Sequence, residues 1–308
     1  MARSIRALSA LENNYITMIA VVVPTNRPEG YKDFLSRWKD QFELHNVELV
    51  TVWDGELPEV EHNGARIPAK DIKGNELVAN YCAGVRNLGF LYVAQYLPEV
   101  QYIVTLDDDM SPNGDTIGDH IKTLQKRLPI SWFSHSGEAY MRGFPYGVRS
   151  EAPVMLSHGV WLKNPDYDAP TQLLNNNAPH SEYYKGAIPK GAFFNFCGMN
   201  VAFRREALPY VYYAPVSDFK GAERFDDIIC GIPMKQDFDR LGWAIATGYA
   251  SCIHERASNV FFNLEKEAVG IRHNEEYWKS PETYDADPWF SKFREKREKW
   301  FNLMKKYV

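Results

Sequence analysis

A short apolar segment that runs directly into three consecutive carboxylates constrains this chain more than any other feature. Tyr102–Leu106 is apolar or β-branched almost throughout, which predicts a buried strand. Asp107, Asp108 and Asp109 follow at once, and Ser111-Pro112-Asn113-Gly114 predicts the turn that ends the segment. Successive side chains of an extended segment alternate in direction, so Asp107 and Asp109 should point to one side and Asp108 to the other.

Two carboxylates on one side of a strand end repel each other unless a cation lies between them. Oxygen ligands of this kind suit Mg²⁺ or Mn²⁺, ions that usually keep positions open for substrate phosphates. An exposed acidic turn is the alternative interpretation. The buried strand that leads into the carboxylates favours the metal site, with Asp107 and Asp109 as its ligands.

Composition narrows the class of protein. The 308 residues are 45% hydrophobic and 24% charged, as in an ordinary globular protein of one large or two modest domains. The net charge of -5 gives no reason to expect a nucleic acid as partner. The apolar run Ile19–Val23 is too short to span a bilayer, and the N-terminus does not read as a signal peptide. The four cysteines form no Cys-x-x-Cys pair, which predicts reduced thiols and a cytoplasmic protein.

Predicted strands and helices alternate along the first half of the chain. The strands are predicted at Tyr15–Pro24, Val47–Trp53 and Val100–Leu106, and the helices at Glu29–Phe42, Glu76–Leu97 and Thr116–Leu128. This order predicts an α/β fold with a mostly parallel central sheet flanked by helices. An amphipathic helix is predicted at Pro288–Val308, so we expect a catalytic domain over residues 1–285. Residues 286–308 would pack on that domain or on a partner subunit.

The carboxyl ends of parallel strands are where such sheets bind ligands, and Thr25, Asp54 and the aspartate triplet each follow a predicted strand. The chain contains no Gly-x-Gly-x-x-Gly after its first strand, no P-loop and no Gly-x-Ser-x-Gly motif. The sequence therefore lacks the signatures of dinucleotide oxidoreductases, P-loop NTPases and serine hydrolases of these types. The ligand that remains possible is a nucleotide whose diphosphate is held by a metal ion and by arginine.

Several segments, taken in order, resemble the plant reversibly glycosylated polypeptides, also called UDP-arabinopyranose mutases. Besides the aspartate triplet, they are Arg142–Arg149, Ser157–Leu162, Pro165–Gln172, Ile188–Gly191, Cys197–Phe203, Arg224–Asp227 and Ser258–Glu267. The resemblance implies a glycosyltransferase-A fold, a UDP-sugar substrate and a divalent metal, Mn²⁺ or Mg²⁺. The interconversion of UDP-L-arabinopyranose and UDP-L-arabinofuranose is the activity that it implies.

We expect the nucleotide sugar to be held by polar side chains near the strand ends. The candidates are Thr25, Asp54, Arg86, Asp107, Asp108, His158 and Lys190. Asp54 could accept from uracil or ribose, or simply cap the turn before Gly55. Arg86 could fork onto phosphate or base, or form a helix-surface salt bridge. His158 and Lys190 could contact sugar or phosphate, and structural roles fit them equally well.

The segment around Arg142 carries the least familiar chemistry. The resemblance implies that Arg142 is reversibly glycosylated and that Arg149 is also important. A guanidinium stays protonated at ordinary pH and is a poor nucleophile, so a carboxylate would have to take its proton. Alternatively, Arg142 and Arg149 clamp the diphosphate opposite Asp107 and Asp109.

Asp226 and Asp227 are the candidate catalytic carboxylates, since a mutase or a transferase needs a base or a group that stabilises the anomeric carbon. One of the two could instead cap a helix that begins near Ile228. His254 follows an apolar run to Ala250 and could complete the metal site with Asp107 and Asp109, or be a packed, hydrogen-bonded histidine.

Three functions stay open at this point. The first is the metal-dependent mutase, with reversible self-glycosylation on arginine as an additional step. The second is a conventional transferase that moves sugar from a UDP-sugar to an external acceptor, and the third is a non-catalytic nucleotide-sugar-binding partner. We expect the protein to bind a UDP-sugar as its substrate and not to bind nucleic acid. We also expect the chain to contain no integral membrane segment. We also expect a homo-oligomer, or a hetero-oligomer with related subunits.

Overall fold

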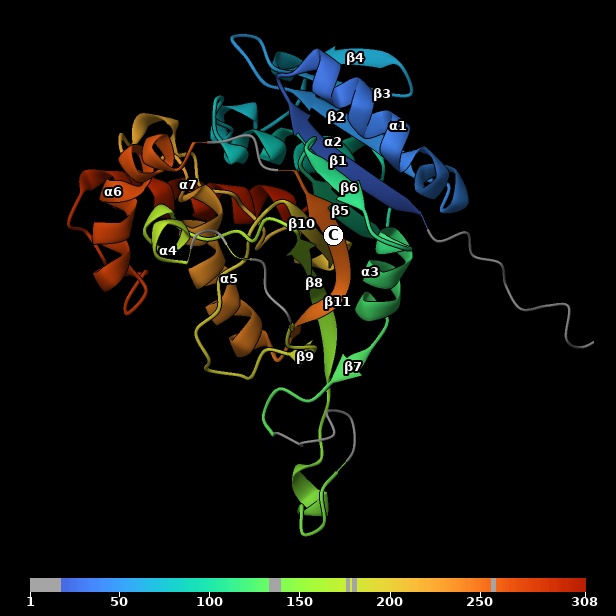
Figure 1. Cartoon of the computed structure of the whole chain (residues 1–308), viewed down its shortest axis with the longest axis vertical. Helices are drawn as coiled ribbons and strands as arrows, with labels where there is room; N and C mark the ends of the chain where they lie inside the picture. The colour runs from blue at the N-terminus through green and yellow to red at the C-terminus, as the bar shows by residue number, and fades with distance from the viewer. Residues whose placement is uncertain (1–17, 133–139, 176–177, 179–181, 256–258) are drawn as a thin grey trace, which may run out of the picture.

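A mixed sheet of eleven strands forms the centre of the computed structural model, which describes residues 18–132, 140–175, 178, 182–255 and 259–308. Helices cover both of its faces (Figure 1). The strands are β1 Ile19–Thr25, β2 Glu48–Trp53, β3 Glu59–His62, β4 Ala65–Pro68, β5 Tyr102–Leu106, β6 Met110–Pro112, β7 Arg127–Leu128, β8 Ala152–Leu162, β9 Gly186–Ala187, β10 Asn200–Arg204 and β11 Ala244–His254. The α-helices are α1 Pro28–Leu44, α2 Asn87–Tyr96, α3 Thr116–Leu124, α4 Ala169–Leu174, α5 Asp226–Leu241, α6 Val260–Tyr277 and α7 Pro288–Met304.

The sheet joins two parallel groups through one antiparallel strand. Strand β1 runs parallel to β2 and β5, and β8 runs parallel to β11. Strand β10 lies between the two groups and is antiparallel to both β5 and β8. The predicted α/β class is confirmed, and the parallel strands of the first half are those that the alternating pattern indicated. Antiparallel pairs occur in both halves of the chain, including β3 with β2 and with β4, so the sheet is mixed.

Side chains of the central strands alternate between two apolar cores, as the period of a strand requires. In β1, Val21 and Val23 face the core covered by α1 and α3, and Ala20 and Val22 face the core covered by α2, α5 and α7. Helix α2 lies so close to β1 that a side chain at Gly89 would overlap Val22. The sheet is therefore buried on both faces, which holds its strand ends rigidly.

Helix α7 packs into the same core as the sheet. Trp289, Phe290, Phe293, Trp300 and Met304 are all buried there. The indole Nε1 of Trp300 also donates to the carbonyl oxygen of Leu208 at 2.9 Å. The apolar stripe that the sequence shows at the C-terminus is thus covered by the rest of the same chain.

Two predicted helices differ clearly from the structure in their boundaries. The helix predicted at Glu76–Leu97 is wrong in its first half, because the chain passes through 3-10 turns before α2 begins at Asn87. Tyr81 lies in this part with a positive φ of 58°, a conformation that a continuous helix cannot contain. The helix predicted to end at Leu128 ends at Leu124, and strand β7 follows. Residues 15–17 of the first predicted strand lie outside the described residues.

Strand β8 was not predicted, because its sequence lies in a stretch that reads as a series of loops. It is eleven residues long and pairs with β10 and β11, so it forms part of the buried centre. Residues 140–149, just before β8, extend away from the body of the molecule, at the lower end of Figure 1. No helix among the described residues is both long enough and apolar enough to cross a membrane.

Candidate functional site

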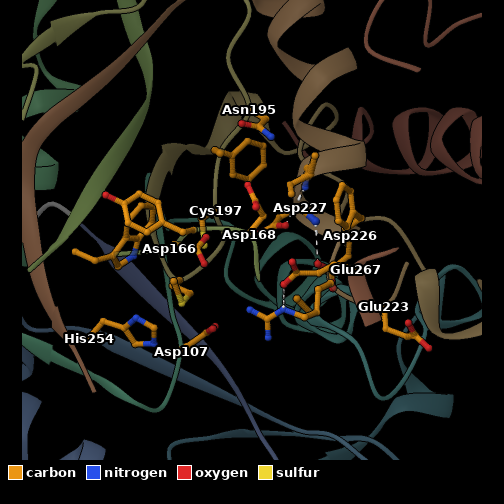
Figure 2. A pocket seen from close by; sticks show the side chains of 18 of the residues that line it. Asp107, Asp166, Asp168, Asn195, Cys197, Glu223, Asp226, Asp227, His254 and Glu267 are labelled. Atoms are coloured by element: carbon orange, nitrogen blue, oxygen red, sulfur yellow. Dashed lines mark hydrogen bonds and ion pairs between the residues drawn. The ribbon is translucent and has the colours of Figure 1, made fainter. Parts of the chain in front are cut away.

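A cleft of about 750 Å³ opens where the carboxyl ends of β5 and β11 approach the start of α5. Eight carboxylates line it, together with two arginines, Arg27 and Arg224. The carboxylates are Asp107, Asp109, Asp166, Asp168, Glu223, Asp226, Asp227 and Glu267. Figure 2 shows Asp107 and His254 at one end and the labelled side chains of Asp226, Asp227 and Glu267 toward the other. The site is therefore a long acidic cleft with two distinct ends.

At the first end, Asp107 is fixed from below by a buried arginine. Arg86 is 2% exposed and its Nη2 lies 2.7 Å from Asp107 Oδ1. The same guanidinium donates to Thr105 Oγ1 at 2.8 Å and to the carbonyl oxygen of Gly198 at 2.7 Å. Arg86 is thus used inside the protein and does not line the cleft, where the sequence placed it as a nucleotide ligand. It orients Asp107 and balances its charge.

Asp109 carries the atom that points most clearly to a cation. Its Oδ1 is buried and has no hydrogen-bond partner among the described residues. Burial, followed by the negative charge of Asp107, raises the pKa of Asp109 above its ordinary value. A buried carboxylate without a partner is costly, and a cation between Asp107 and Asp109 would remove that cost. The residues present therefore fit a divalent metal.

His254 lies at the same end, on the last residue of β11. Its Nδ1 donates to the carbonyl oxygen of Asn164 at 3.0 Å, which fixes the ring and leaves the lone pair on Nε2. In Figure 2 the ring points toward Asp107. Within the described part of the chain, no three His, Cys, Asp or Glu side chains already form a metal cage. A metal held here would complete its shell with phosphate and water oxygens, as Mg²⁺ commonly does.

Asp108 lies in the turn after β5 and does not line the cleft, and it anchors the neighbouring loop. It is 5% exposed and accepts from Thr25 Oγ1 at 2.6 Å. Its carboxylate also pairs with Arg27, whose guanidinium reaches Asp109 at 3.4 Å. Arg27 lines the cleft, whereas Thr25 and Asp108 do not. Thr25 and Asp108, which were predicted as nucleotide ligands, thus position Arg27, which was not predicted as a site residue.

At the second end, Asp226 and Asp227 form the first turn of α5, two residues earlier than the predicted helix start. Asp227 accepts from the backbone N–H of Gly198 at 3.0 Å and of Ile228 at 2.9 Å. Asp226 is 4% exposed, and its Oδ2 is buried with no partner among the described residues. Burial raises the pKa of Asp226 to about 6. Burial, then the charges of Asp226 and Asp166, raises the pKa of Asp227 to about 8. This pair can hold one proton near neutral pH.

Glu267 of α6 ties together the two segments that carry the remaining acids. Its Oε2 accepts from the N–H of Ala169 at 2.7 Å, at the start of α4, and its Oε1 pairs with Arg224 Nε at 2.9 Å. The first contact holds the segment with Asp166 and Asp168, and the second holds the segment with Asp226 and Asp227. Glu267 therefore sets the spacing across the acidic end.

His158 lines the cleft as a neutral, packed side chain. Burial lowers the pKa of His158 to about 3. Its Nε2 accepts from the N–H of Cys197 at 3.3 Å, and its Nδ1 hydrogen-bonds to Thr247 Oγ1 at 3.1 Å. All four cysteines are free thiols, as the sequence predicts. Burial raises the pKa of Cys197 well above its ordinary value, so this thiol is not a nucleophile in the structure.

Four other predicted site residues do not line the cleft: Asp54, Arg142, Arg149 and Lys190. Both oxygens of Asp54 accept from the N–H of Tyr81, at 2.9 Å each, so this carboxylate holds a segment that lies 27 residues later in the chain. Arg142 and Arg149 lie on the extension before β8, away from Asp107 and Asp109. The expected placement of these arginines opposite the aspartates does not occur within this chain, and their roles stay predictions.

Some lining residues were within reach of sequence reasoning. Arg27 stands two residues after Thr25 in the same loop after the first strand, so the same argument applies to it. Asp166 and Asp168 lie in the Pro165–Gln172 segment, one of those that carry the resemblance. Glu267 is the last residue of another such segment, Ser258–Glu267, but no role was inferred for it, because a single Glu on a helix is usually solvated.

Comparisons with known proteins identify relatives that match most of this chain. The profile of the family described as reversibly glycosylated polypeptide matches residues 16–279. The chain is 33% identical to UDP-arabinopyranose mutase 3 of Arabidopsis thaliana over 277 residues, which covers 83% of this chain and 75% of that protein. It is 32% identical to UDP-arabinopyranose mutase 1 of Oryza sativa subsp. japonica, over 82% of this chain and 73% of that protein.

Among solved structures, the catalytic domain of Drosophila beta1,4galactosyltransferase 7 is similar at 12% identity. The match covers 80% of this chain and 78% of that chain. Its TM-score of 0.36 is too low to carry an argument, so the α/β assignment rests on the strand order described above. The family match and the curated relatives each extend over most of the sequence, and the chain belongs to the reversibly glycosylated polypeptide family.

Proposed function

We propose that this protein is a UDP-sugar mutase that interconverts UDP-L-arabinopyranose and UDP-L-arabinofuranose. Its membership of the family and the names of its curated relatives support the reaction. The observation that carries the proposal is the cleft itself, which joins the Asp107–Asp109 end to a coupled pair of acids. We also propose that the chain has the glycosyltransferase-A fold, in which such a cleft is expected. We further propose that the protein is cytoplasmic, and its four free thiols support this location.

The two ends of the cleft suit the two parts of the substrate. Asp107, Asp109 and His254 would hold a divalent metal, which when bound neutralises the diphosphate and stabilises UDP as a leaving group. Arg27 adds a positive charge beside them. The sugar then extends toward Asp226 and Asp227, whose oxygens can accept from its hydroxyl groups.

Ring contraction requires a proton to move between two sugar oxygens. In the pyranose form O5 is the ring oxygen and O4 carries a proton, whereas in the furanose form these roles are exchanged. Once the bond between C1 and UDP breaks, O4 loses its proton as it bonds to C1, O5 gains a proton as its own bond to C1 breaks, and UDP then rejoins C1. Asp226 and Asp227 share a proton near neutral pH, so one can accept from O4 while the other donates to O5.

Reversible glycosylation of Arg142 is a separate part of the proposal, because the cleft can account for the isomerisation without it. If it occurs, the activated C1 of the sugar bonds to a guanidinium nitrogen, UDP leaves, and a carboxylate takes the nitrogen's proton. The acidic end of the cleft supplies suitable acceptors. Arg142 itself is exposed on the extension before β8.

The direct test incubates the purified protein with Mn²⁺ and UDP-arabinopyranose and separates the products by chromatography. We expect the furanose form to appear, and Asp227→Asn to slow its formation by about 100-fold or more. Asp33→Asn, at an exposed position on α1, is the matched control and should leave the rate unchanged. Release of UDP only when an acceptor is added would favour the transferase, and binding of UDP without any product would favour the binding protein.

A further inference from the structure

The extension before β8 has the character of a docking element. We call residues 140–149 the arm tip. Tyr146 is 84% exposed and Met141 39% exposed, although both are large apolar side chains. Arg149 stacks between Tyr140 and Tyr146, with its guanidinium carbon 3.7 Å from the centre of the Tyr146 ring. Arg142 is exposed. The arm tip thus presents aromatic rings and two positive charges with no acidic residue.

The arm tip is braced in a direction that takes it away from its own cleft. Trp132 packs against Phe144, and its Nε1 donates to the carbonyl oxygen of Ser150 at 2.8 Å. Arg127 Nη2 donates to the carbonyl oxygen of Glu151 at 2.6 Å, where β7 pairs with β8. The arm therefore continues the line of β8 beyond its first residue, as Figure 1 shows.

The distance to the cleft follows from the length of β8. His158 lines the cleft and Ala152 begins the strand, so six residues separate the cleft from the base of the arm. At about 3.3 Å per residue, this is about 20 Å. An arginine side chain cannot cover that distance. To reach its own cleft the arm would have to break its contacts at Trp132 and fold back.

The cleft, in turn, lacks the positive charge that a UDP-sugar needs. Eight carboxylates face two arginines there, and both arginines are already paired, Arg27 with Asp108 and Arg224 with Glu267. A diphosphate carries negative charge into this surface. One divalent metal would offset only part of the repulsion, so further cations from outside the cleft would stabilise the bound substrate.

We propose that the arm tip of one copy enters the cleft of a second copy and supplies Arg142 and Arg149 to the bound nucleotide sugar. The charge of the arm tip is complementary to that of the cleft, and no refolding is required. A two-fold dimer would make the exchange reciprocal, with each copy giving an arm and receiving one. The identity of the ligand rests on the proposed function. The pairing of arm tip and cleft rests on the structure alone.

Mixed complexes test this exchange. Full-length chains with two different affinity tags are co-expressed, one carrying Arg142→Ala in the arm and the other Asp227→Asn in the cleft. Complexes that hold both tags are purified and assayed for UDP-arabinofuranose. Each variant assembled only with itself is expected to be nearly inactive. The mixed dimer has one intact cleft served by one intact arm, so we expect about half of the wild-type rate.

The outcomes separate the exchange from the mutase reaction. A mixed complex as inactive as its parents, beside an active wild type, would show that each arm serves its own cleft and would overturn the inference. If the wild type itself produces no furanose, the mutase proposal fails, and recovery of doubly tagged complexes decides the exchange alone. That recovery should fall when both chains carry Arg142→Ala and Arg149→Ala, and should persist with Arg240→Ala, an exposed arginine on α5. The exchange would be refuted if the wild type gave no doubly tagged complexes, or if the arm variants gave as many as the wild type.

Discussion

Replacing Asp227 by Asn should change how the stability of this protein depends on pH. The raised pKa of about 8 means that folded Asp227 keeps its proton at pH values where the unfolded chain has already lost it. Stability from this group is therefore complete below about pH 4, the ordinary carboxyl pKa, and falls as the pH rises toward 8. Asn carries no titrating proton, so the variant should lack this fall.

The magnitude follows from the same shift. Between pH 5 and pH 8 the wild type should lose about 1.4 kcal/mol for each pH unit, or about 4 kcal/mol in all. This is an upper value, because Asp227 is partly open to the cleft and water screens its charge. Asn also places an N–H₂ against the backbone N–H of Gly198 or Ile228, which costs about 1–3 kcal/mol at every pH. The variant should thus be less stable than the wild type at pH 5 and gain on it steadily up to pH 8.

Urea unfolding at pH 5, 6, 7 and 8 measures this difference directly, with Asp33→Asn as the control. The control should keep a constant offset from the wild type, because its carboxylate is exposed on α1. Parallel pH curves for the wild type and Asp227→Asn would show that Asp227 is ionised in the folded protein at neutral pH. The proton transfer derived for the mutase would then lose its donor.

Three further predictions concern the arm, the metal and the core. Arg142→Lys keeps a positive charge, so we expect mutase activity within about 10-fold of the wild type; a loss equal to that of Arg142→Ala would show that the guanidinium itself is required. Asp109→Asn should weaken Mn²⁺ binding in calorimetric titrations by about 10-fold or more, and unchanged affinity would remove Asp109 from the metal site. Gly89→Ala should lower the free energy of unfolding by about 1–3 kcal/mol, because its new methyl group overlaps Val22. Gly55→Ala, where a Cβ meets nothing within 4 Å, is its control, and equal thermal unfolding of the two variants would contradict the close packing of α2.

Local sequence was sufficient wherever an apolar strand and the polar residues at its end defined the feature. Asp107 and Asp109 line the cleft and Asp108 does not, as predicted, but the three residues form a turn after β5 and not an extended segment, since the N–H of Met110 donates to the carbonyl oxygen of Asp107 at 3.1 Å. Strands β1, β2 and β5 and helix α1 could be predicted because each carries its own apolar pattern. Asp226 and Asp227 could be named because two adjacent acids begin a helix.

Other features depended on contacts between residues far apart in the sequence. Arg86 could have pointed into the cleft or into the protein, and Gly198, 112 residues later, decided the matter by accepting its hydrogen bond. Strand β8 reads as loop because its stability comes from β10 and β11 and not from its own pattern.

The sequence by itself determined the chemistry of this protein: an acidic strand end, a second pair of acids and an arginine-containing segment. Only the tertiary structure decided which of these groups share a cleft. The sheet brings both acidic groups to one edge, because the ends of β5 and β11 and the start of α5 converge there. It sends Arg142 and Arg149 to the opposite end of β8, since a strand eleven residues long separates its two ends whatever their sequences.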